Sequence, residues 1–483
     1  MRKRLVVLAA AAAAVGVAAL LRRSVRGRRN LDIAALGVQV GGAYATTAAR
    51  KLFATAERRV ELDRDRELRT AEAITDRLGN MKGALMKLGQ MASYVTEGLP
   101  EPMRLALAEL QSNAPPMSAD LAAGVIEREL GAAPDKVFVQ WDPQPIASAS
   151  IGQVHRAVVV DPATGLERAV AVKVQYPGVG AAIEADLRNA SLLGAILKQG
   201  FGGLDPDDMV AEIRERLIDE LDYTLEAVNQ QAFADFYRGH PFIHVPDVLA
   251  SHSTSRVLTS ELVSGATWQE MLQWPQHERN LVGECLFRFV FRSLYGMHRF
   301  NGDPHPGNYL FHKGGRITFL DFGLVKQFTT AEMATFVGMV RSAAYDHDVP
   351  TFRRIVEDAG MLRRGAPADD EAIGDYFGQF YESVKDDKVV TWSSEYASRI
   401  VRHTFDRTSP ISQYATVPRA FVFIQRINLG LYALLGELSA TGNYRRMAEE
   451  VWPFVQGPPS TAMAEAEQTW LTDRRGRDDV LSG

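Results

Sequence analysis

Apolar residues recur at helical spacing from residue 31 to about residue 118, which predicts a helical region ahead of the main domain. Residues 62–78 are dense in Arg, Asp and Glu with apolar positions between them, as in a partly exposed helix, whereas residues 81–94 are more apolar. Prolines punctuate the end of this region, at positions 100, 102, 115 and 116. We therefore expect a helical extension over residues 31–118.

The next part of the chain changes from helical to strand-like spacing. A short helix is predicted at residues 119–130, followed by three strands of one antiparallel sheet: residues 137–139, 152–160 and 169–174. Helices are expected to return at residues 179–236, and further strands at 245–248 and 256–262. This pattern indicates a small lobe over residues 119–265 that is built around an antiparallel sheet.

From residue 267 onwards the pattern is helical, apart from a predicted hairpin near residues 310–320. The sequence after residue 457 is polar and is expected to be mobile. The predicted fold class is therefore α+β. It has a small antiparallel-sheet lobe, a large helical lobe over residues 266–457 and a polar tail over residues 458–483.

Composition narrows the class of protein without identifying it. The chain has 483 residues, of which 46% are hydrophobic and 23% charged, as in an ordinary globular protein. Its net charge of −5 gives no reason to expect nucleic acid as a partner. The single cysteine, Cys285, excludes an internal disulfide and a thiolate zinc site, and its apolar neighbours predict a buried helical position.

Acidic and amide side chains follow the apolar run at residues 286–300 in a pattern that suits metal-assisted phosphoryl transfer. Asp303 and Asn308 lie five residues apart, and Asp321 of an Asp-Phe-Gly tripeptide comes thirteen residues later. Kinases use this order of residues to hold two Mg²⁺ ions and to orient an acceptor group. We expect Asn308 and Asp321 to be Mg²⁺ ligands and Asp303 to face the nucleophile. Because the tripeptide alone occurs by chance, the prediction depends on the succession of helix, loop and hairpin.

A lysine with a carboxylate partner is the second part of the expected nucleotide site. Lys173 ends the run Val-Ala-Val-Lys, which matches the strand that carries the phosphate-binding lysine of kinases. Asp222 and Glu226 lie four residues apart in a predicted helix and are expected to share one face. A solvated acidic face is the alternative, but the metal-binding pattern favours pairing of Lys173 with Glu226.

The segment before Lys173 has no Gly-x-Gly-x-x-Gly motif, although the loop that covers the nucleotide is expected there. Small residues take its place, and they still let a loop approach phosphates closely. Alanine at glycine positions should make this loop stiffer. The residues expected to contact the nucleotide, besides Lys173, are Ala147, Ser148, Ala149, Ser150, Gly152, Gln153, Glu261 and Val263.

Together these motifs resemble the UbiB/AarF family of atypical kinases. The resemblance covers about residues 70–440 and includes the Ala-rich loop, the stretch from Asp303 to Asn308, a Lys-x-Gly-Gln motif at Lys87 and Gln90, and a Glu-x-Asp motif at Glu220 and Asp222. It implies a two-lobed protein-kinase-like fold in which the helix with Lys87 and Gln90 occupies the active site, near Glu220 and Asp222. It also implies a link to coenzyme Q or other prenyl-lipid metabolism. The residues alone would make Lys87 a lysine that snorkels from an apolar helix.

Two features differ from conventional protein kinases. Gly302 stands where a protein kinase has the Arg of His-Arg-Asp, and a helix predicted at 331–345 leaves little room for a peptide-docking segment. We therefore expect an enzyme that uses ATP and Mg²⁺ either to hydrolyse ATP or to phosphorylate a small or lipid-like acceptor. The alternatives are a slow, nucleotide-gated lipid-binding or chaperone module and a soluble small-molecule phosphotransferase of the aminoglycoside type.

The first 30 residues suggest where this chemistry takes place. Residues 5–21 carry no polar side chain, are flanked by basic residues, and as a helix would span about 26 Å, slightly less than a hydrocarbon core. A membrane anchor, a cleaved secretory signal and an amphipathic targeting peptide are the competing interpretations. The larger basic cluster after residue 21 favours an anchor with the kinase-like domain in the cytoplasm. The expected partners are the membrane surface, a prenyl or quinone intermediate, and proteins of lipid biosynthesis.

Overall fold

The computed structural model describes residues 117–149, 151–161, 164–180, 221–405, 409–416 and 418–482. The predicted N-terminal segment and helical extension lie outside these residues, as do Lys87, Gln90, Ser150 and Glu220. The elements below belong to one compact unit of the chain.

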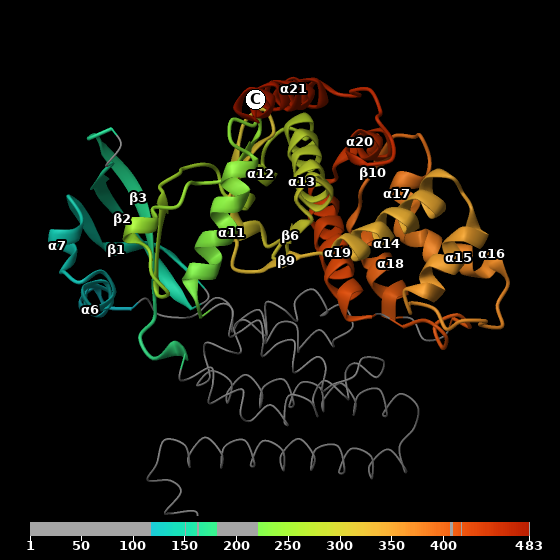
Figure 1. Ribbon diagram of the computed structural model, residues 1–483, viewed down its shortest axis with the longest axis horizontal. Helices are drawn as coiled ribbons and strands as arrows, with labels where there is room; N and C mark the ends of the chain where they lie inside the picture. Colours follow the sequence, from blue (N-terminus) through green and yellow to red (C-terminus); the bar gives the residue numbers. More distant parts are fainter. Residues whose placement is uncertain are drawn as a thin grey trace, which may run out of the picture. The chain divides into compact units, whose positions relative to one another are not determined.

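The small lobe is an antiparallel sheet of four strands in the order β1-β2-β3-β5, as the α+β prediction requires (Figure 1). The strands are β1 (Gln140–Ser148), β2 (Gly152–Val160), β3 (Glu167–Gln175) and β5 (Val257–Glu261). One face of the sheet packs on α6 (Ala119–Leu130), through the buried side chains of Ile126, Val172 and Val174. Successive strand residues point to opposite faces, so the residue between these two valines, Lys173, is directed to the other face.

The predicted strand at residues 137–139 is wrong. A one-turn helix, α7 (Pro134–Val137), occupies this position, and β1 begins only at Gln140. Pro134 stands at the first helical position, where its fixed φ favours a helical turn. The apolar run instead supplies Phe138, which is buried under the sheet and stacks on Trp141.

Helix α11 (Tyr223–Phe236) lies beside the sheet and begins later than its sequence pattern indicated. Asp222 is the N-cap of this helix, and its carboxylate accepts a hydrogen bond from the Thr224 amide at 2.9 Å. The prediction that Asp222 and Glu226 share one face of a helix is therefore wrong, because Asp222 lies outside the helix. Capping by aspartate competes with helical backbone at this position, which explains the later start.

The predicted hairpin near residues 310–320 is confirmed. Strands β7 (Tyr309–His312) and β8 (Arg316–Phe319) pair antiparallel across a turn in which Gly314 and Gly315 have positive φ. The two-residue strand β4 (Ile243–His244) adds to β8 in parallel. It replaces the strand expected at residues 245–248, where Pro246 cannot donate a hydrogen bond to a sheet.

The rest of the described chain is mostly helical and forms the large lobe (Figure 1). Its helices are α12 (Trp268–Leu272), α13 (Gln276–Met297), α14 (Thr330–Val340), α15 (Val349–Asp358), α16 (Asp370–Gly378), α17 (Glu382–Lys385), α18 (Ser394–Phe405), α19 (Arg419–Leu438), α20 (Tyr444–Val451) and α21 (Ala462–Ser482). Shorter elements are η2 (Ala250–His252), η3 (Pro306–Asn308), η4 (Arg341–Tyr345), η5 (Gln379–Tyr381), β6 (Arg299–Asn301), β9 (Val325–Gln327), β10 (Val390–Thr391) and β11 (Thr441–Gly442).

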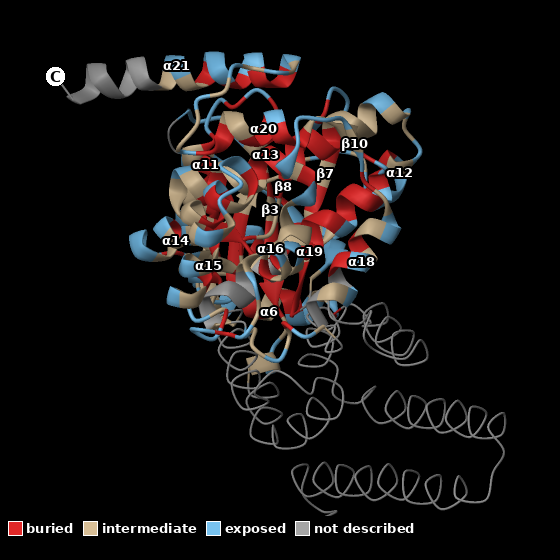
Figure 2. Ribbon diagram, turned by 90° about the vertical axis from the view of Figure 1, so that its right-hand side faces the viewer, coloured by how far each residue is buried: buried red, intermediate tan, exposed pale blue. Residues whose placement is uncertain are grey.

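Helix α13 is central to the core of the large lobe. Cys285 and Phe287 on this helix are buried, as expected for Cys285, and join a cluster that extends to β8 and α19. Figure 2 shows buried residues concentrated in α13, the strands and the helices around them. None of the helices in the described ranges is both long and apolar enough to span a bilayer.

The tail after residue 457 was predicted to be mobile, but it forms a helix. Helix α21 packs on the large lobe with Met463, Ala464, Glu467 and Trp470 buried, and the Trp470 indole donates a hydrogen bond to the Arg238 carbonyl at 3.1 Å. These four side chains recur at helical spacing, so they form one stripe on an otherwise polar helix. The prediction failed because a single narrow stripe hardly changes the composition of the segment.

Candidate active site

Lys173 and Glu226 form the ion pair that the sequence predicted. Strand β3 presents Lys173 on the face opposite α6, and α11 places Glu226 in its first turns. The Lys173 Nζ lies 2.7 Å from Oε1 and 2.8 Å from Oε2 of Glu226. The Lys173 and Glu226 side chains are only 15% and 5% exposed, so water screens the pair weakly.

Asp321 completes a cluster around the same lysine. Its Oδ2 lies 3.6 Å from the Lys173 Nζ, and its Oδ1 accepts a hydrogen bond from the Gly323 amide at 2.9 Å. A Cβ at Gly323 would lie 3.3 Å from Oδ1, so glycine suits this tight turn. Phe322 is fully buried, and its ring centroid lies 4.8 Å from that of Phe233 on α11. This contact holds Asp321 beside the helix that carries Glu226.

The charges around Lys173 favour its protonated form. Burial by itself lowers the pKa of Lys173, but the carboxylates of Asp321 and Glu226 outweigh burial and hold this pKa well above its ordinary value. Lys173 is therefore a fixed positive charge at neutral pH. Two carboxylate side chains, Glu226 and Asp321, lie within 4 Å of this one lysine, a formal excess of negative charge that favours a bound cation.

Asp303 and Asn308 lie together in a loop that short strands hold at both ends. Asp303 is 7% exposed, and its Oδ2 accepts a hydrogen bond from the Asn308 amide group at 3.1 Å. Strand β6 pairs with β9 before the loop, and the Gly302 amide donates to the Leu324 carbonyl at 2.7 Å. A Cβ at Gly302 would lie 3.2 Å from that carbonyl oxygen, so the close approach of the two segments favours glycine there.

Two residues that the sequence analysis assigned no role support this loop. The Asn301 side chain donates to the Asp321 carbonyl at 2.7 Å and accepts from the Asp303 amide at 3.2 Å, so it fixes both segments. Gly430 on α19 packs against Pro304, whose Cγ would lie 2.3 Å from a Cβ at that position. Asn301 opens the motif and could have been suspected from its position, whereas nothing local in the sequence indicates Gly430.

The oxygen donors of Asn308 and Asp321 fit Mg²⁺ in their chemistry. An amide oxygen and a carboxylate are hard ligands of the kind that Mg²⁺ prefers, and Mg²⁺ sites of this type draw their remaining ligands from phosphates and water. No group of three His, Cys, Asp or Glu residues suited to a metal occurs in the described ranges. The chain's contribution would therefore be a partial site that a nucleotide completes.

The Ala-rich loop connects β1 and β2, as expected for a loop that covers a nucleotide. Ala147 and Ser148 end β1, and the Ala149 amide donates to the Gly152 carbonyl at 2.9 Å, which closes a tight turn. A Cβ at Gly152 would lie 2.4 Å from the Val174 carbonyl oxygen, so this glycine serves the approach of β2 to β3.

Gln153 was expected to contact the nucleotide, but its side chain lies on the opposite face of the sheet. It is fully buried on the α6 face, where its Oε1 accepts from the Met117 amide at 2.8 Å and its Nε2 lies 2.9 Å from His155. Strand alternation explains the difference, because the neighbouring Val154 pairs with Lys173 and shares its face.

Glu261 and Val263 lie at the end of β5 and in the connection to the large lobe. The Glu261 carboxylate is 3.6 Å from Arg168 and 3.5 Å from His244, and these two partners lower the pKa of Glu261. The Glu261 side chain is thus directed to Arg168 and His244, and its backbone amide donates a hydrogen bond to the Asp247 carbonyl at 2.9 Å, so the nucleotide contact expected of Glu261 stays a prediction, as does that of Val263.

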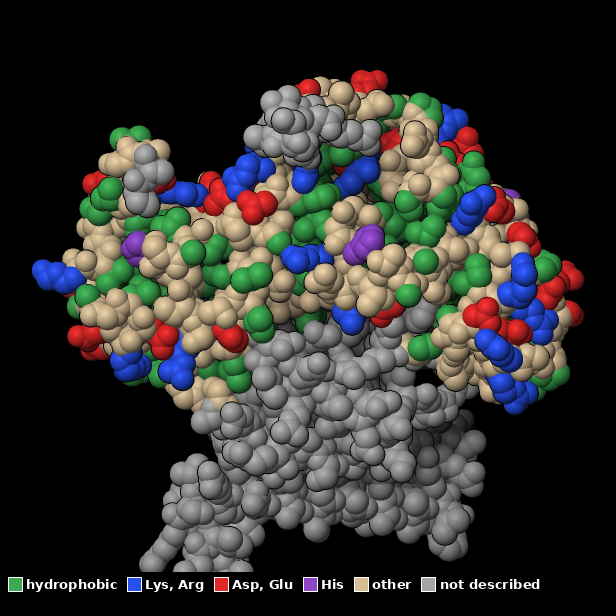
Figure 3. All heavy atoms as spheres, in the orientation of Figure 1, with side chains coloured by type: hydrophobic (Ala, Val, Ile, Leu, Met, Phe, Trp, Pro, Cys, Tyr) green, Lys and Arg blue, Asp and Glu red, His purple; other side chains and the backbone are tan. Residues whose placement is uncertain are grey.

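Side chains of both charge signs are mixed over the face shown in Figure 3, without one continuous basic area on the described residues.

The sheet lobe with its Lys173–Glu226 pair and the helical lobe with its Asp303 loop and Asp321 define a protein-kinase-like domain, as the fold prediction proposed. Comparison with known proteins is consistent with this class. Residues 109–355 match the family model described as the ABC1 atypical kinase-like domain, which covers half of the chain. The chain belongs to this family, and the resemblance to UbiB/AarF kinases is confirmed.

The chain is similar to curated proteins of eukaryotic organelles. It is 33% identical over 279 residues to the mitochondrial atypical kinase COQ8B of Rattus norvegicus, a match that covers 57% of this chain and 51% of the relative. It is 30% identical over 259 residues to COQ8 of Saccharomyces cerevisiae, covering 53% and 51%. The chain thus spans about half the length of these relatives.

The chain is also similar to a solved structure, and the match covers most of both chains. The complex of Rv3197 with erythromycin from Mycobacterium tuberculosis is 31% identical, with a TM-score of 0.58, and the match covers 82% of this chain and 99% of that chain.

Proposed function

We propose that the chain is an atypical kinase or ATPase that binds ATP with Mg²⁺ and hydrolyses ATP or phosphorylates a small or lipid-like acceptor. The observation that carries the proposal is the single cluster formed by Lys173, Glu226 and Asp321 beside the Asp303–Asn308 loop. Phosphoryl transfer needs positioning and charge stabilisation more than covalent chemistry, and this cluster offers both.

Each side chain has a role that follows from its position. Lys173 would contact the α- and β-phosphates, and Glu226 would hold its rotamer. Asn308 and Asp321 would hold Mg²⁺, which neutralises phosphate charge when it is bound. Asp303 would orient the attacking water or hydroxyl, since its carboxylate is buried and fixed by Asn308.

The residues implied by the family resemblance extend this site. Lys87, Gln90 and Glu220 lie outside the described residues, and Asp222 caps the helix that carries Glu226. We infer from the family resemblance that the segment with Lys87 and Gln90 folds over the pocket where a protein kinase would admit a peptide, and that Glu220 and Asp222 lie near Lys87. An acceptor in quinone or prenyl-lipid metabolism, a membrane anchor in the first 30 residues, and protein partners of lipid biosynthesis belong to the same proposal.

Replacing one metal ligand tests the proposed chemistry. Asp321→Asn should abolish Mg²⁺-dependent release of phosphate from ATP, because the amide removes the charge that binds the metal. Asp358→Asn is the matched control, since Asp358 forms an exposed ion pair with Arg364 far from the loop in sequence. Unchanged turnover in the Asp321→Asn protein would contradict the assignment. Lipid analysis of a deletion strain would then identify the pathway through a missing quinone or prenyl lipid.

A nucleotide-gated binding module is the second candidate, because the similar mycobacterial protein was solved with erythromycin, a ligand that is not a nucleotide. Purified protein that binds ATP without releasing phosphate, with or without lipid, would favour this function. Phosphate release that depends on Asp321 would favour the enzyme.

A further inference from the structure

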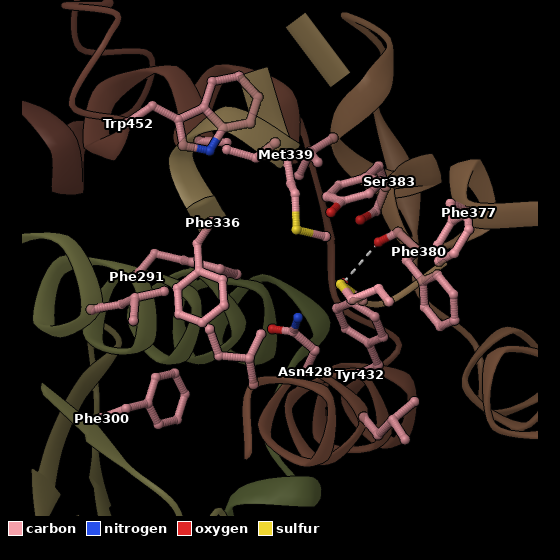
Figure 4. Close-up of a pocket in the computed structure, with 18 of the residues that line it drawn as sticks. Phe291, Phe300, Phe336, Met339, Phe377, Phe380, Ser383, Asn428, Tyr432 and Trp452 are labelled. Atoms are coloured by element: carbon pink, nitrogen blue, oxygen red, sulfur yellow. Dashed lines mark hydrogen bonds between the residues drawn. The ribbon is translucent and has the colours of Figure 1, made fainter. Parts of the chain in front are cut away.

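A cavity of about 170 Å³ lies inside the large lobe, apart from the residues of the proposed active site. Its wall comes from α13, α14, α16, α19, α20 and neighbouring segments, and about half of the lining residues are aromatic (Figure 4). Phe291, Phe336, Phe377 and Trp452 are among the lining residues. Native interiors contain few voids larger than a water molecule, so a space of this size needs an explanation.

The size of the cavity defines the size of an occupant. An engineered protein cavity of about 150 Å³ with an apolar wall stays dry and binds benzene. The present cavity is of similar volume and has a similarly apolar lining. It therefore suits a compact molecule with a single ring.

The chemistry of the wall restricts the occupant further. None of the lining residues carries a charge, which excludes nucleotides and other phosphorylated molecules. Asn428, Tyr295 and Tyr381 line the cavity, and within the described part of the chain their side chains have no hydrogen-bond partner. Figure 4 shows the Asn428 amide pointing into the space between Phe336, Met339 and Tyr432. Polar groups that face an apolar space need a partner, so the occupant should offer a polar atom.

We propose that this cavity is a binding site for a small, neutral, mainly apolar ring compound that carries one hydroxyl or carbonyl group. The ring fills the aromatic space, and the polar atom bonds to the Asn428 amide. This combination of an apolar pocket with a few convergent polar groups is typical of small-molecule sites. The site goes beyond the proposed phosphoryl transfer, because no residue of that site lines it.

Paired titrations of the full chain with benzyl alcohol and with toluene test the proposal. Both compounds carry one benzene ring, but only benzyl alcohol has a hydroxyl group. Wild-type protein should bind both saturably, and ATP with Mg²⁺ should displace neither. Asn428→Leu should weaken benzyl alcohol about tenfold, the usual effect of one hydrogen bond, and leave toluene within twofold. Gln468→Leu, an exposed helical amide on α21, is the matched control and should change neither affinity.

Filling the cavity gives an independent test. Ala448 is buried in the wall, so Ala448→Leu should abolish binding of both compounds, with a thermal melt to verify folding. If that protein does not fold, Thr416→Leu at the exposed rim is the second filling variant. Absence of saturable binding to the wild type, or binding that survives in a folded filling variant, would overturn the proposal. Because these titrations need no ATP turnover, their outcome does not depend on the proposed function.

Discussion

Removing the charge of Glu226 should show how much the positioning of Lys173 contributes to ATP turnover. Glu226→Gln keeps the size of the side chain but removes the carboxylate that lies 2.7 Å from the lysine. With an effective dielectric constant of about 20, Coulomb's law gives about 6 kcal/mol for two charges at this distance, an upper limit because desolvation opposes it. A hydrogen bond to a charged group contributes about 1.5 to 3 kcal/mol net, and we take the upper part of that range because both groups are buried.

A loss of about 2 to 3 kcal/mol in the transition state corresponds to a fall of roughly 30- to 150-fold in kcat/KM for ATP. The half-saturating Mg²⁺ concentration should also rise. Without the Glu226 carboxylate, Lys173 keeps Asp321, 3.6 Å away in the wild type, as its carboxylate partner and so competes with the metal for it. Steady-state phosphate release over a Mg²⁺ titration measures both effects.

Glu382→Gln is the matched control for Glu226→Gln. Glu382 pairs with Arg399, but both side chains are about half exposed, and exposed pairs contribute about 1 kcal/mol or less. Turnover should change less than twofold in this variant. If Glu226→Gln folds and keeps kcat/KM within twofold of the wild type, the reasoning that Glu226 positions a phosphate-binding lysine is refuted.

Two further predictions concern a buried ion pair of the large lobe and the packing behind the Asp303 loop. Glu467→Gln should lower the free energy of unfolding by about 1.5 to 3 kcal/mol in urea titrations at pH 7, because it weakens charged hydrogen bonds from Arg288 and Arg292, although Arg288 keeps Glu284 and Glu450 as partners. Burial alone would raise the pKa of Glu467, but the hydrogen bond from His240 and the charges of Arg292 and Arg288 hold it below the ordinary value. Stability from Glu467 is therefore present above its unfolded-state pKa of about 4.3 and is lost as the pH falls below it, and this loss should be absent in Glu467→Gln. Gly430→Ala should displace Pro304 and reduce kcat at least tenfold, with about 1 to 3 kcal/mol of destabilisation from overpacking, measured by phosphate release and thermal melts.

The controls for these two variants use the same substitutions at other positions. Gly378→Ala introduces a methyl group with no atom within 4 Å and should leave both turnover and stability within error or slightly improved. Glu395→Gln, at an exposed position in the first turn of α18, should keep the wild-type response of stability to pH. Equal losses in a variant and its control would contradict the packing or charge argument behind it.

The sequence by itself determined the order of the chemistry along the chain. Motifs such as the Asp303–Asn308 stretch and Asp-Phe-Gly are local, because their spacing is set by a loop and a hairpin that a few residues encode. The alternation of β3 likewise places Lys173 opposite the residues that form the core of the small lobe. These are properties of short segments, and the α+β class could therefore be predicted. The Lys173–Glu226 pair joins residues 53 positions apart, and it was predicted from the kinase motifs around it.

Only the tertiary structure decided which side chains from distant parts of the chain meet. Gln153 bonds to Met117 on the α6 face, and Trp470 in the polar tail bonds to Arg238, two contacts between segments that are distant in the sequence. Gly430 packs against Pro304, and Asn428 lines a cavity together with residues of α13, each more than a hundred residues earlier in the chain. The roles of both residues therefore appear only once α19 is packed in the folded chain. A sequence pattern records which face of a segment is buried, whereas the identity of the neighbour on that face is a property of the folded chain.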